Sequence, residues 1–162
     1  MSDYPPMIMR YPDDLTFWKR IKLPWTKPPL SMNDAAPASR GAVYGRAAKK
    51  REIQELLHLL GRGLSMPEGK RYLLVQMNYR VPDKRRRDTD NVTASSKPLM
   101  DALSAGSKRI PGLSLVDDDT PYFMGKPEPI LWPPVRGERG AMWVDLWVAA
   151  GPPFPYCDTL TP

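Results

Sequence analysis

Two segments that alternate apolar and polar residues restrict this chain to folds that contain a β-sheet. Residues 71–81, RYLLVQMNYRV, carry an apolar residue at every odd position from Leu73 to Val81. Residues 141–149, AMWVDLWVA, repeat the pattern with Met142, Val144, Leu146 and Val148. Because successive side chains of a strand point to opposite faces, both segments are predicted to be strands with one buried face.

A third, shorter strand is predicted for residues 17–25, FWKRIKLPW, which Pro24 ends. The alternation would place Phe17, Lys19, Ile21 and Leu23 on one face, opposite Trp18, Arg20 and Lys22. Further along the chain, residues 113–119 are predicted to be the end of a strand, and the turn-rich residues 121–134 are predicted to be paired with a neighbour.

Two segments between these strands have the features of helices. In residues 41–60 one helical stripe is apolar, consisting of Ile53, Leu56, Leu57 and Leu60. Residues 95–106 are predicted to form a shorter helix with Pro98 in its first turn, where proline is tolerated. The order of elements indicates an α+β domain, a small mixed β-sheet with two main helices packed on one face.

The 162 residues suffice for one domain, which we place at 17–149 between an N-terminal extension, 1–16, and a flexible tail, 150–162. No apolar run approaches the about 18 residues that a membrane helix needs, so no membrane partner is expected. The first residues lack the apolar core of a signal peptide, and a cytoplasmic location is the expectation.

Charge and composition narrow the chemistry. A net charge of +6 favours an anionic partner, either nucleic acid or an acidic membrane surface. The single cysteine, Cys157, and the single histidine, His58, leave no disulfide framework and no zinc cluster. No phosphate-binding or dinucleotide fingerprint occurs, so no small-molecule cofactor is expected. Any catalysis must therefore use carboxylates and lysine, with or without a hard metal ion.

Two acidic motifs carry that potential. KRRRDTDNV, residues 84–92, sets four cations against Asp88 and Asp90, whose two-residue spacing puts both carboxylates on one side of an extended chain. The second motif is the triple acid at 117–119. Between them, Lys97 and Asp101 are four residues apart and can share one helix face. Carboxylates of this kind bind Mg²⁺ together with water and phosphate oxygens.

Each motif has a simpler interpretation. Acid clusters are commonly solvated turns, and the first motif is also compatible with a salt-bridged surface loop. A calcium loop is excluded, because DTDNVTASSKPL has Val92 at a ligand position, Thr93 in place of the turn glycine and Leu99 in place of the bidentate glutamate.

The combined motifs resemble the RusA family of Holliday-junction resolvases, small metal-dependent endonucleases of bacteria and their phages. The resemblance rests on RRRDTDN at 85–91, Lys97, DAL at 101–103 followed by Ala-Gly, and VDDD at 116–119. It extends over about 17–149, and it includes LPW at 23–25 and the Ser-Met-Asn segment that ends at Asn33.

The resemblance implies a homodimer that binds a four-way DNA junction and nicks one strand per subunit with Mg²⁺, for which Mn²⁺ can substitute. By position, Asp88 and Asp90 resemble paired metal ligands, Asp118 the third ligand, and Lys97 the essential lysine. Because three acids stand where the family has two, Asp117 and Asp119 are alternatives to Asp118.

The residues expected to contact DNA are cations and amides near these motifs: Lys84, Arg85, Arg86, Arg87, Asn91, Asn33, Arg46, Lys49 and Lys50. One departure from the family pattern concerns the spacer before Lys97, where the five residues VTASS add about one helical turn. Two alternative functions remain: a nuclease that acts chiefly on flaps and forks, and a non-catalytic basic nucleic-acid-binding module in which the acids are structural.

Overall fold

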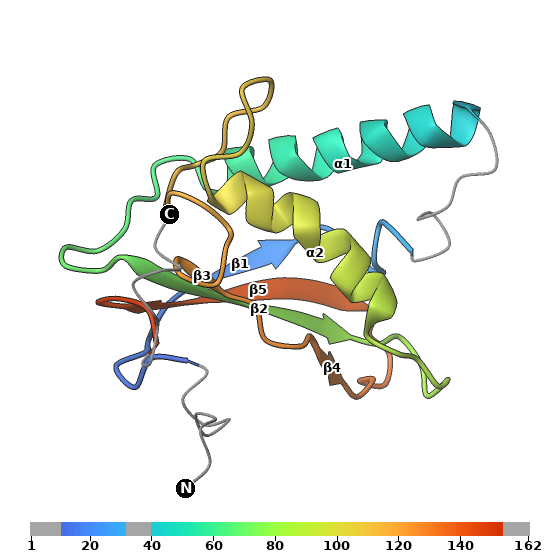
Figure 1. The fold of residues 1–162 in the computed structure, drawn as a ribbon. Coiled ribbons are helices and arrows are strands. Elements are labelled where there is room, and N and C mark those ends of the chain that lie inside the picture. Colours follow the sequence, from blue (N-terminus) through green and yellow to red (C-terminus); the bar gives the residue numbers. More distant parts are fainter. Residues whose placement is uncertain (1–10, 32–39, 154–162) are drawn as a thin grey trace, which may run out of the picture.

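A mixed five-stranded sheet with two helices on one face forms the described part of the protein, residues 11–31 and 40–153 of a computed structural model (Figure 1). This confirms the expected α+β class and the expected layers. No helix in these residues is long and apolar enough to span a bilayer. Along the chain the elements are β1 (Thr16–Leu23), α1 (Arg40–Leu60), β2 (Tyr72–Arg80), α2 (Asp90–Leu103), β3 (Met124–Gly125), β4 (Ile130–Trp132) and β5 (Ala141–Ala149).

The two strands predicted from alternation form the centre of the sheet. The strand order is β1-β5-β2-β3, and β4 also pairs with β2. β5 is antiparallel to both β1 and β2, whereas β3 and β4 are parallel to β2. The prediction that residues 121–134 pair with a neighbour is therefore confirmed, and the parallel strands make the sheet mixed.

A β-bulge between Phe17 and Lys19 corrects the predicted faces of β1. Phe17 lies opposite Trp147, and their rings meet edge to face at 5.5 Å between centroids. Trp18 packs against the main core instead. The extra residue of a bulge reverses the alternation on one side of it, so a simple two-residue pattern assigns the first residues of β1 to the wrong faces.

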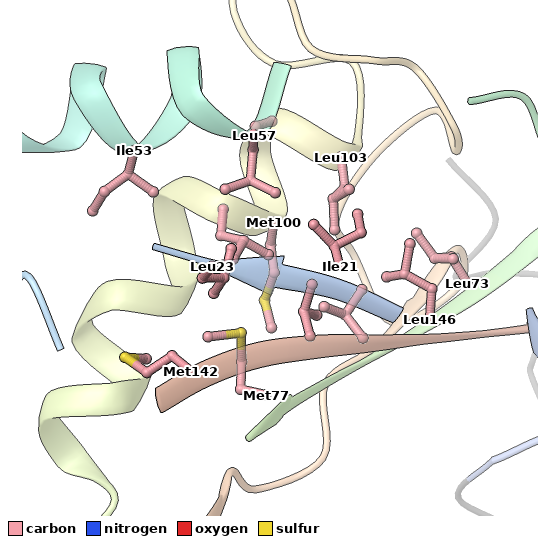
Figure 2. Packing of buried hydrophobic residues seen from close by; sticks show 14 of the residues in the cluster. Ile21, Leu23, Ile53, Leu57, Leu73, Met77, Met100, Leu103, Met142 and Leu146 are labelled. Carbon is pink, nitrogen blue, oxygen red and sulfur yellow. The ribbon is translucent and has the colours of Figure 1, made fainter. Parts of the chain in front are cut away.

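The core lies between the sheet and the helices (Figure 2). The odd residues of β2 and the even residues of β5 face it, as the alternation predicts. Among the described side chains of α1, those buried in the core come from its second half, Ile53 and Leu57. Leu60, which we predicted to lie on the same apolar stripe, is 41% exposed, so the prediction is wrong for this residue. The first half of α1 extends beyond the sheet, and its Val43 and Tyr44 are exposed.

Helix α2 begins at Asp90, five residues before the predicted start, so the VTASS spacer is helical. Its early turns are fixed by Ser95, whose buried hydroxyl accepts a hydrogen bond from the Leu30 amide at 3.1 Å. We predicted Pro98 in the first turn, which is wrong: it lies inside the helix, because the helix begins at Asp90. Buried apolar contacts by Val92, Leu99 and Leu103 hold the helix in place despite the missing proline N–H.

The predicted strand end at 113–119 is wrong, because these residues form a loop that docks on the end of α2. The amides of Leu113 and Leu115 donate to the carbonyls of Ala102 and Leu103 at 2.7 and 3.0 Å. The loop thus satisfies helix-terminal carbonyls that would otherwise lack partners. Gly112 is required there, since a Cβ would lie 1.9 Å from the Ser104 carbonyl oxygen.

The domain boundaries remain predictions. Residues 11–15 of the expected N-terminal extension are not separate from the domain: Tyr11 and Leu15 pack against Tyr72 on the outer face of the sheet. The side chain of Asp14 accepts a hydrogen bond from the Ala150 amide at 3.0 Å. Residues 1–10 of the extension and 154–162 of the tail, with Cys157, lie outside the described residues.

Candidate functional site

The basic run lies in the loop between β2 and α2, and one of its arginines is bound by an acid that precedes the run. Arg87 donates from Nη1 to Asp83 Oδ1 at 2.8 Å, and the same nitrogen lies 3.2 Å from the carbonyl oxygens of Asp83 and Arg85. The Arg87 side chain is only 26% exposed. Arg87 therefore forms hydrogen bonds within its own loop, although we predicted it to contact DNA.

Asp83 is the acceptor that organises this turn. It also accepts from the Arg85 amide at 2.9 Å. The hydrogen bonds from Arg87 and from that amide lower the pKa of Asp83 to about 2. The remaining cations of the run are exposed: Lys84 and Arg86 are exposed, and the Arg85 side chain is 86% exposed, although its Nε lies 4.0 Å from Asp83 Oδ2. These three cations could contact an anion in solvent.

The other cations and amides predicted to contact DNA are spread over the molecule. Lys49 is exposed on the first half of α1, where Arg46 and Lys50 are half-buried. Asn91 is exposed in the first turn of α2. Asn33 lies outside the described residues.

Asp88 and Asp90 are neighbours at the start of α2, but not on an extended chain as we predicted. Asp88 Oδ1 accepts from the Asp90 amide at 3.2 Å, and Asp90 is the first helical residue. Between them, Thr89 donates its hydroxyl proton to Glu128 Oε1 at 2.9 Å, which ties this corner to the connection between β3 and β4. Both aspartates are exposed.

Lys97 lies on the same face of α2 as Asp90. Seven residues separate them within one continuous helix, and seven residues make almost two turns at 3.6 residues per turn. The spacer that departs from the family pattern therefore keeps Lys97 on this face while moving it along the axis. The distance along the helix is about 10 Å.

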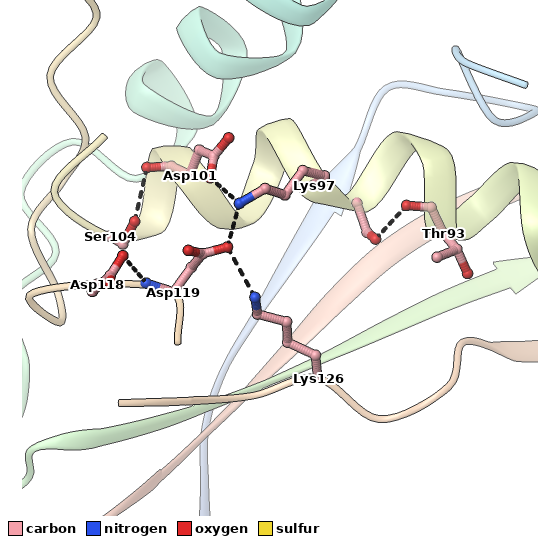
Figure 3. Close-up of polar contacts among 8 residues, drawn as sticks. Thr93, Lys97, Asp101, Ser104, Asp118, Asp119 and Lys126 are labelled. Carbon is pink, nitrogen blue, oxygen red and sulfur yellow. Dashed lines mark hydrogen bonds and ion pairs between the residues drawn. The ribbon is translucent and has the colours of Figure 1, made fainter. Parts of the chain in front are cut away.

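The Lys97 ammonium group is held between two carboxylates (Figure 3). It donates to Asp101 Oδ1 at 2.8 Å and to Asp119 Oδ2 at 2.5 Å. Lys126 donates to the same Asp119 oxygen at 2.9 Å. Partial burial opposes both charges, but the hydrogen bonds outweigh it, so the pKa of Lys97 is raised and that of Asp119 is lowered to about 2.

The three acids at 117–119 have different surroundings. Asp119 is paired with two lysines and its side chain is 14% exposed. Asp118 is exposed, and its Oδ1 accepts from the Asp119 amide at 2.8 Å. Asp117 is exposed and lines a pocket of about 490 Å³ together with Lys70, Arg71 and Tyr122. Of the three, Asp118 and Asp117 remain accessible to a cation.

The acidic residues of this region have the right ligand atoms for Mg²⁺, but they are not all close enough together to bind one ion. Carboxylate oxygens are the preferred ligands, and one or two carboxylates with water and phosphate oxygens suffice. Asp88 and Asp90 meet that requirement. Across residues 11–31 and 40–153, however, no three Asp, Glu, His or Cys side chains form a group that could hold a metal. The described arrangement thus fits a cation on two carboxylates, and it does not bring Asp118 to Asp88 and Asp90.

Three residues of this region were not predicted from the sequence: Asp83, Lys126 and Glu128. Asp83 follows Pro82 directly before the basic run, and its position four residues before Arg87 is the one local signal for their pairing. Lys126 and Glu128 lie in a turn-rich segment without periodicity, and their contacts reach residues far away in the sequence.

No protein-family model and no curated protein matches this chain.

Proposed function

We propose that this protein is a divalent-cation-dependent endonuclease that nicks branched DNA, with four-way junctions as its main substrate. It would act as a homodimer in the cytoplasm of a bacterium or a phage-infected host. One observation carries the proposal: α2 presents Asp90 and Lys97 on one face, with Asp88 adjacent and the acidic loop 117–119 docked along the same helix. This combination of carboxylates and ammonium groups is suited to a metal ion and a phosphodiester.

Each group then has a chemical role. Asp88 and Asp90 would hold Mg²⁺ or Mn²⁺, with water and phosphate oxygens completing the coordination. Asp118, the third ligand expected from the sequence, would have to move toward them to take part. The bound cation would lower the pKa of a water molecule and neutralise charge on the phosphate. Lys97 supplies positive charge to DNA on the same face of α2. The exposed Lys84, Arg85 and Arg86 would contact phosphates, which positions DNA without selecting its sequence.

A second candidate function is a non-catalytic nucleic-acid-binding module. It is favoured by the ion pairs of Asp119 and by the lack of a three-acid group among the described residues. In that case the acids act as structural partners of lysine and of helix α2, and the basic loop provides the binding surface.

Strand nicking by the wild type and by Asp90→Asn separates the candidates. On end-labelled four-way junctions with Mg²⁺, we expect paired symmetric nicks by the wild type and bound but uncut junction with the variant. Glu55→Gln, which removes the same charge from an exposed position on α1, is the control and should cut normally. Equal cutting by wild type and Asp90→Asn would refute the site, and no cutting by either would favour the binding module.

Substrate choice needs a second comparison. Nicking rates on junction, flap, fork and linear duplex DNA of equal length should be highest on the junction. Faster cutting of flaps or forks would assign the protein to the alternative class of branched-DNA nuclease.

A further inference from the structure

We propose that Lys97 and Lys126 form one binding site for a single phosphodiester group, and that Asp119 holds their two ammonium groups together until a phosphate oxygen replaces it. The assignment of this phosphate to DNA rests on the proposed function. The two-lysine site itself rests on the geometry alone. Lys126 has no role in the predictions from sequence.

Both ammonium groups converge on one atom. Lys97 and Lys126 lie within hydrogen-bonding distance of the same oxygen, Asp119 Oδ2. A phosphate oxygen in that position would accept from both lysines, as the carboxylate oxygen does. Two cations that share one acceptor atom are already close enough to share a phosphate, so little rearrangement is needed on binding.

Three separate parts of the fold fix this convergence (Figure 3). Lys97 is carried by α2, and Asp119 follows the loop docked on the end of that helix. Lys126 directly follows β3, which is paired in parallel with β2. At the end of β3, a Cβ on Gly125 would lie 2.4 Å from the Tyr72 hydroxyl. The backbone directly before Lys126 is therefore closely packed against β2.

The lysines remain able to exchange partners. The Lys97 side chain is 60% exposed and that of Lys126 is 34% exposed, so both can be reached from solvent. An ammonium group has three donors, and the described contacts use two on Lys97 and one on Lys126. A phosphate oxygen that takes the place of the carboxylate oxygen restores both ammonium contacts, so it offsets the loss of the Asp119 ion pairs.

The position along α2 indicates which phosphate is bound. Lys97 lies about 10 Å along the helix from Asp90, and it donates toward Asp101, away from Asp90. The same short connection after β3 contacts both regions, through Lys126 at Asp119 and Glu128 at Thr89. The lysine pair therefore takes a phosphate that neighbours the one at Asp88 and Asp90, and it acts in positioning DNA.

Salt dependence of DNA binding tests the pair without requiring cleavage. Affinities for a four-way junction are measured in EDTA between 50 and 200 mM salt for Lys97→Gln, Lys126→Gln and the double variant. Removing one shared phosphate contact should lower the slope of log affinity against log salt by about 0.9. Over this range the wild-type affinity then falls about threefold more than that of the double variant.

The losses of DNA affinity caused by the two lysine substitutions are expected to be non-additive. Because both lysines bind one phosphate, the double variant should lose little more than either single variant. Lys22→Gln is the matched control. Lys22 carries the same charge and is exposed on β1 opposite Trp143, between the core residues Ile21 and Leu23, so it faces away from the core. Additive losses, or a slope that Lys126→Gln leaves unchanged, would overturn the proposal. Thermal unfolding of each variant checks that it is folded.

Asp119→Asn supplies a second measurement on the same site. The substitution frees both ammonium groups, so it should raise the metal-free affinity for junction DNA in the wild-type background. This gain in affinity should disappear when Lys97 and Lys126 are both glutamine. Equal tightening in both backgrounds would mean that Asp119 acts only by general repulsion of DNA.

A minimal probe separates this inference from the proposed function. A thymidine dinucleotide has one phosphodiester and no branch, and it should shift the NMR signals of the ε-methylene groups of Lys97 and Lys126 together. Such shifts in a protein that never nicks DNA would refute the nuclease and leave the two-lysine site intact. Absence of the shifts would refute the site, even in an active nuclease.

Discussion

Arg87 donates to Asp83 across the turn that follows β2, and not to Asp88 or Asp90, the acids that directly follow it in the sequence. The pairing separates two functions within one short segment. One arginine shapes the loop, while the exposed cations beside it and the two aspartates stay accessible to ligands.

The loop should depend on the guanidinium of Arg87 and not on its charge alone. Arg87→Lys retains the charge but loses the planar set of donors that reaches the Asp83 side chain and two carbonyl oxygens. We expect faster amide hydrogen exchange at residues 84–89 in this variant. Arg86→Lys, at an exposed position in the same loop, should leave exchange unchanged. Equal exchange in both variants would mean that Arg87 does not hold the loop.

Acid should remove the contribution of Asp119 to stability. Its folded pKa, about 2, lies below that of an unfolded aspartate, so its stabilisation is complete above about pH 4 and is lost as the pH falls toward 2. Because Lys97 is largely exposed, we expect Asp119→Asn to cost about 1–2 kcal/mol at pH 7 and less below pH 3. Urea unfolding across this pH range measures both. Asp117→Asn, at an exposed neighbour, should cost under about 0.5 kcal/mol at pH 7.

The start of α2 should depend on Ser95. Its hydroxyl is the acceptor for the buried Leu30 amide, so Ser95→Ala leaves that amide without this partner. We expect the free energy of unfolding to fall by about 1–3 kcal/mol. Thr93→Ala removes an exposed hydroxyl that bonds only within the same turn of chain, and a loss below about 0.5 kcal/mol is expected in denaturant unfolding. A Ser95→Ala variant as stable as Thr93→Ala would contradict the anchoring role.

Metal-free DNA binding should respond to the paired aspartates. Asp88→Asn removes a negative charge beside the phosphate it is proposed to face, and we expect affinity in EDTA to rise about twofold at low salt. Glu55→Gln on the exposed side of α1 serves as the charge-matched control. Fluorescence anisotropy with labelled junction DNA measures the difference, and weaker binding by Asp88→Asn would place the phosphate elsewhere.

The predictions made from the periodicity of apolar residues were the accurate ones. β5 has the predicted bounds, α1 starts one residue earlier than predicted, and β2 is shorter than predicted by one residue at each end. The errors fell where a local pattern was interrupted by distant contacts. A bulge against β5 moved Phe17 to the other face, and α2 starts at Asp90, ahead of its predicted start, with Val92 buried in the core.

In the candidate site, too, local features could be predicted from the sequence and contacts between distant residues could not. From sequence alone, the residue types, the acidic and basic motifs and the proximity of Lys97 to Asp101 could be specified, because these depend on spacing within one helix or one loop. Tertiary structure decided that Asp119 pairs with both Lys97 and Lys126 and that Thr89 meets Glu128. Those contacts join a helix, a docked loop and a strand connection that only the folded sheet brings together, so no periodicity along the chain records them.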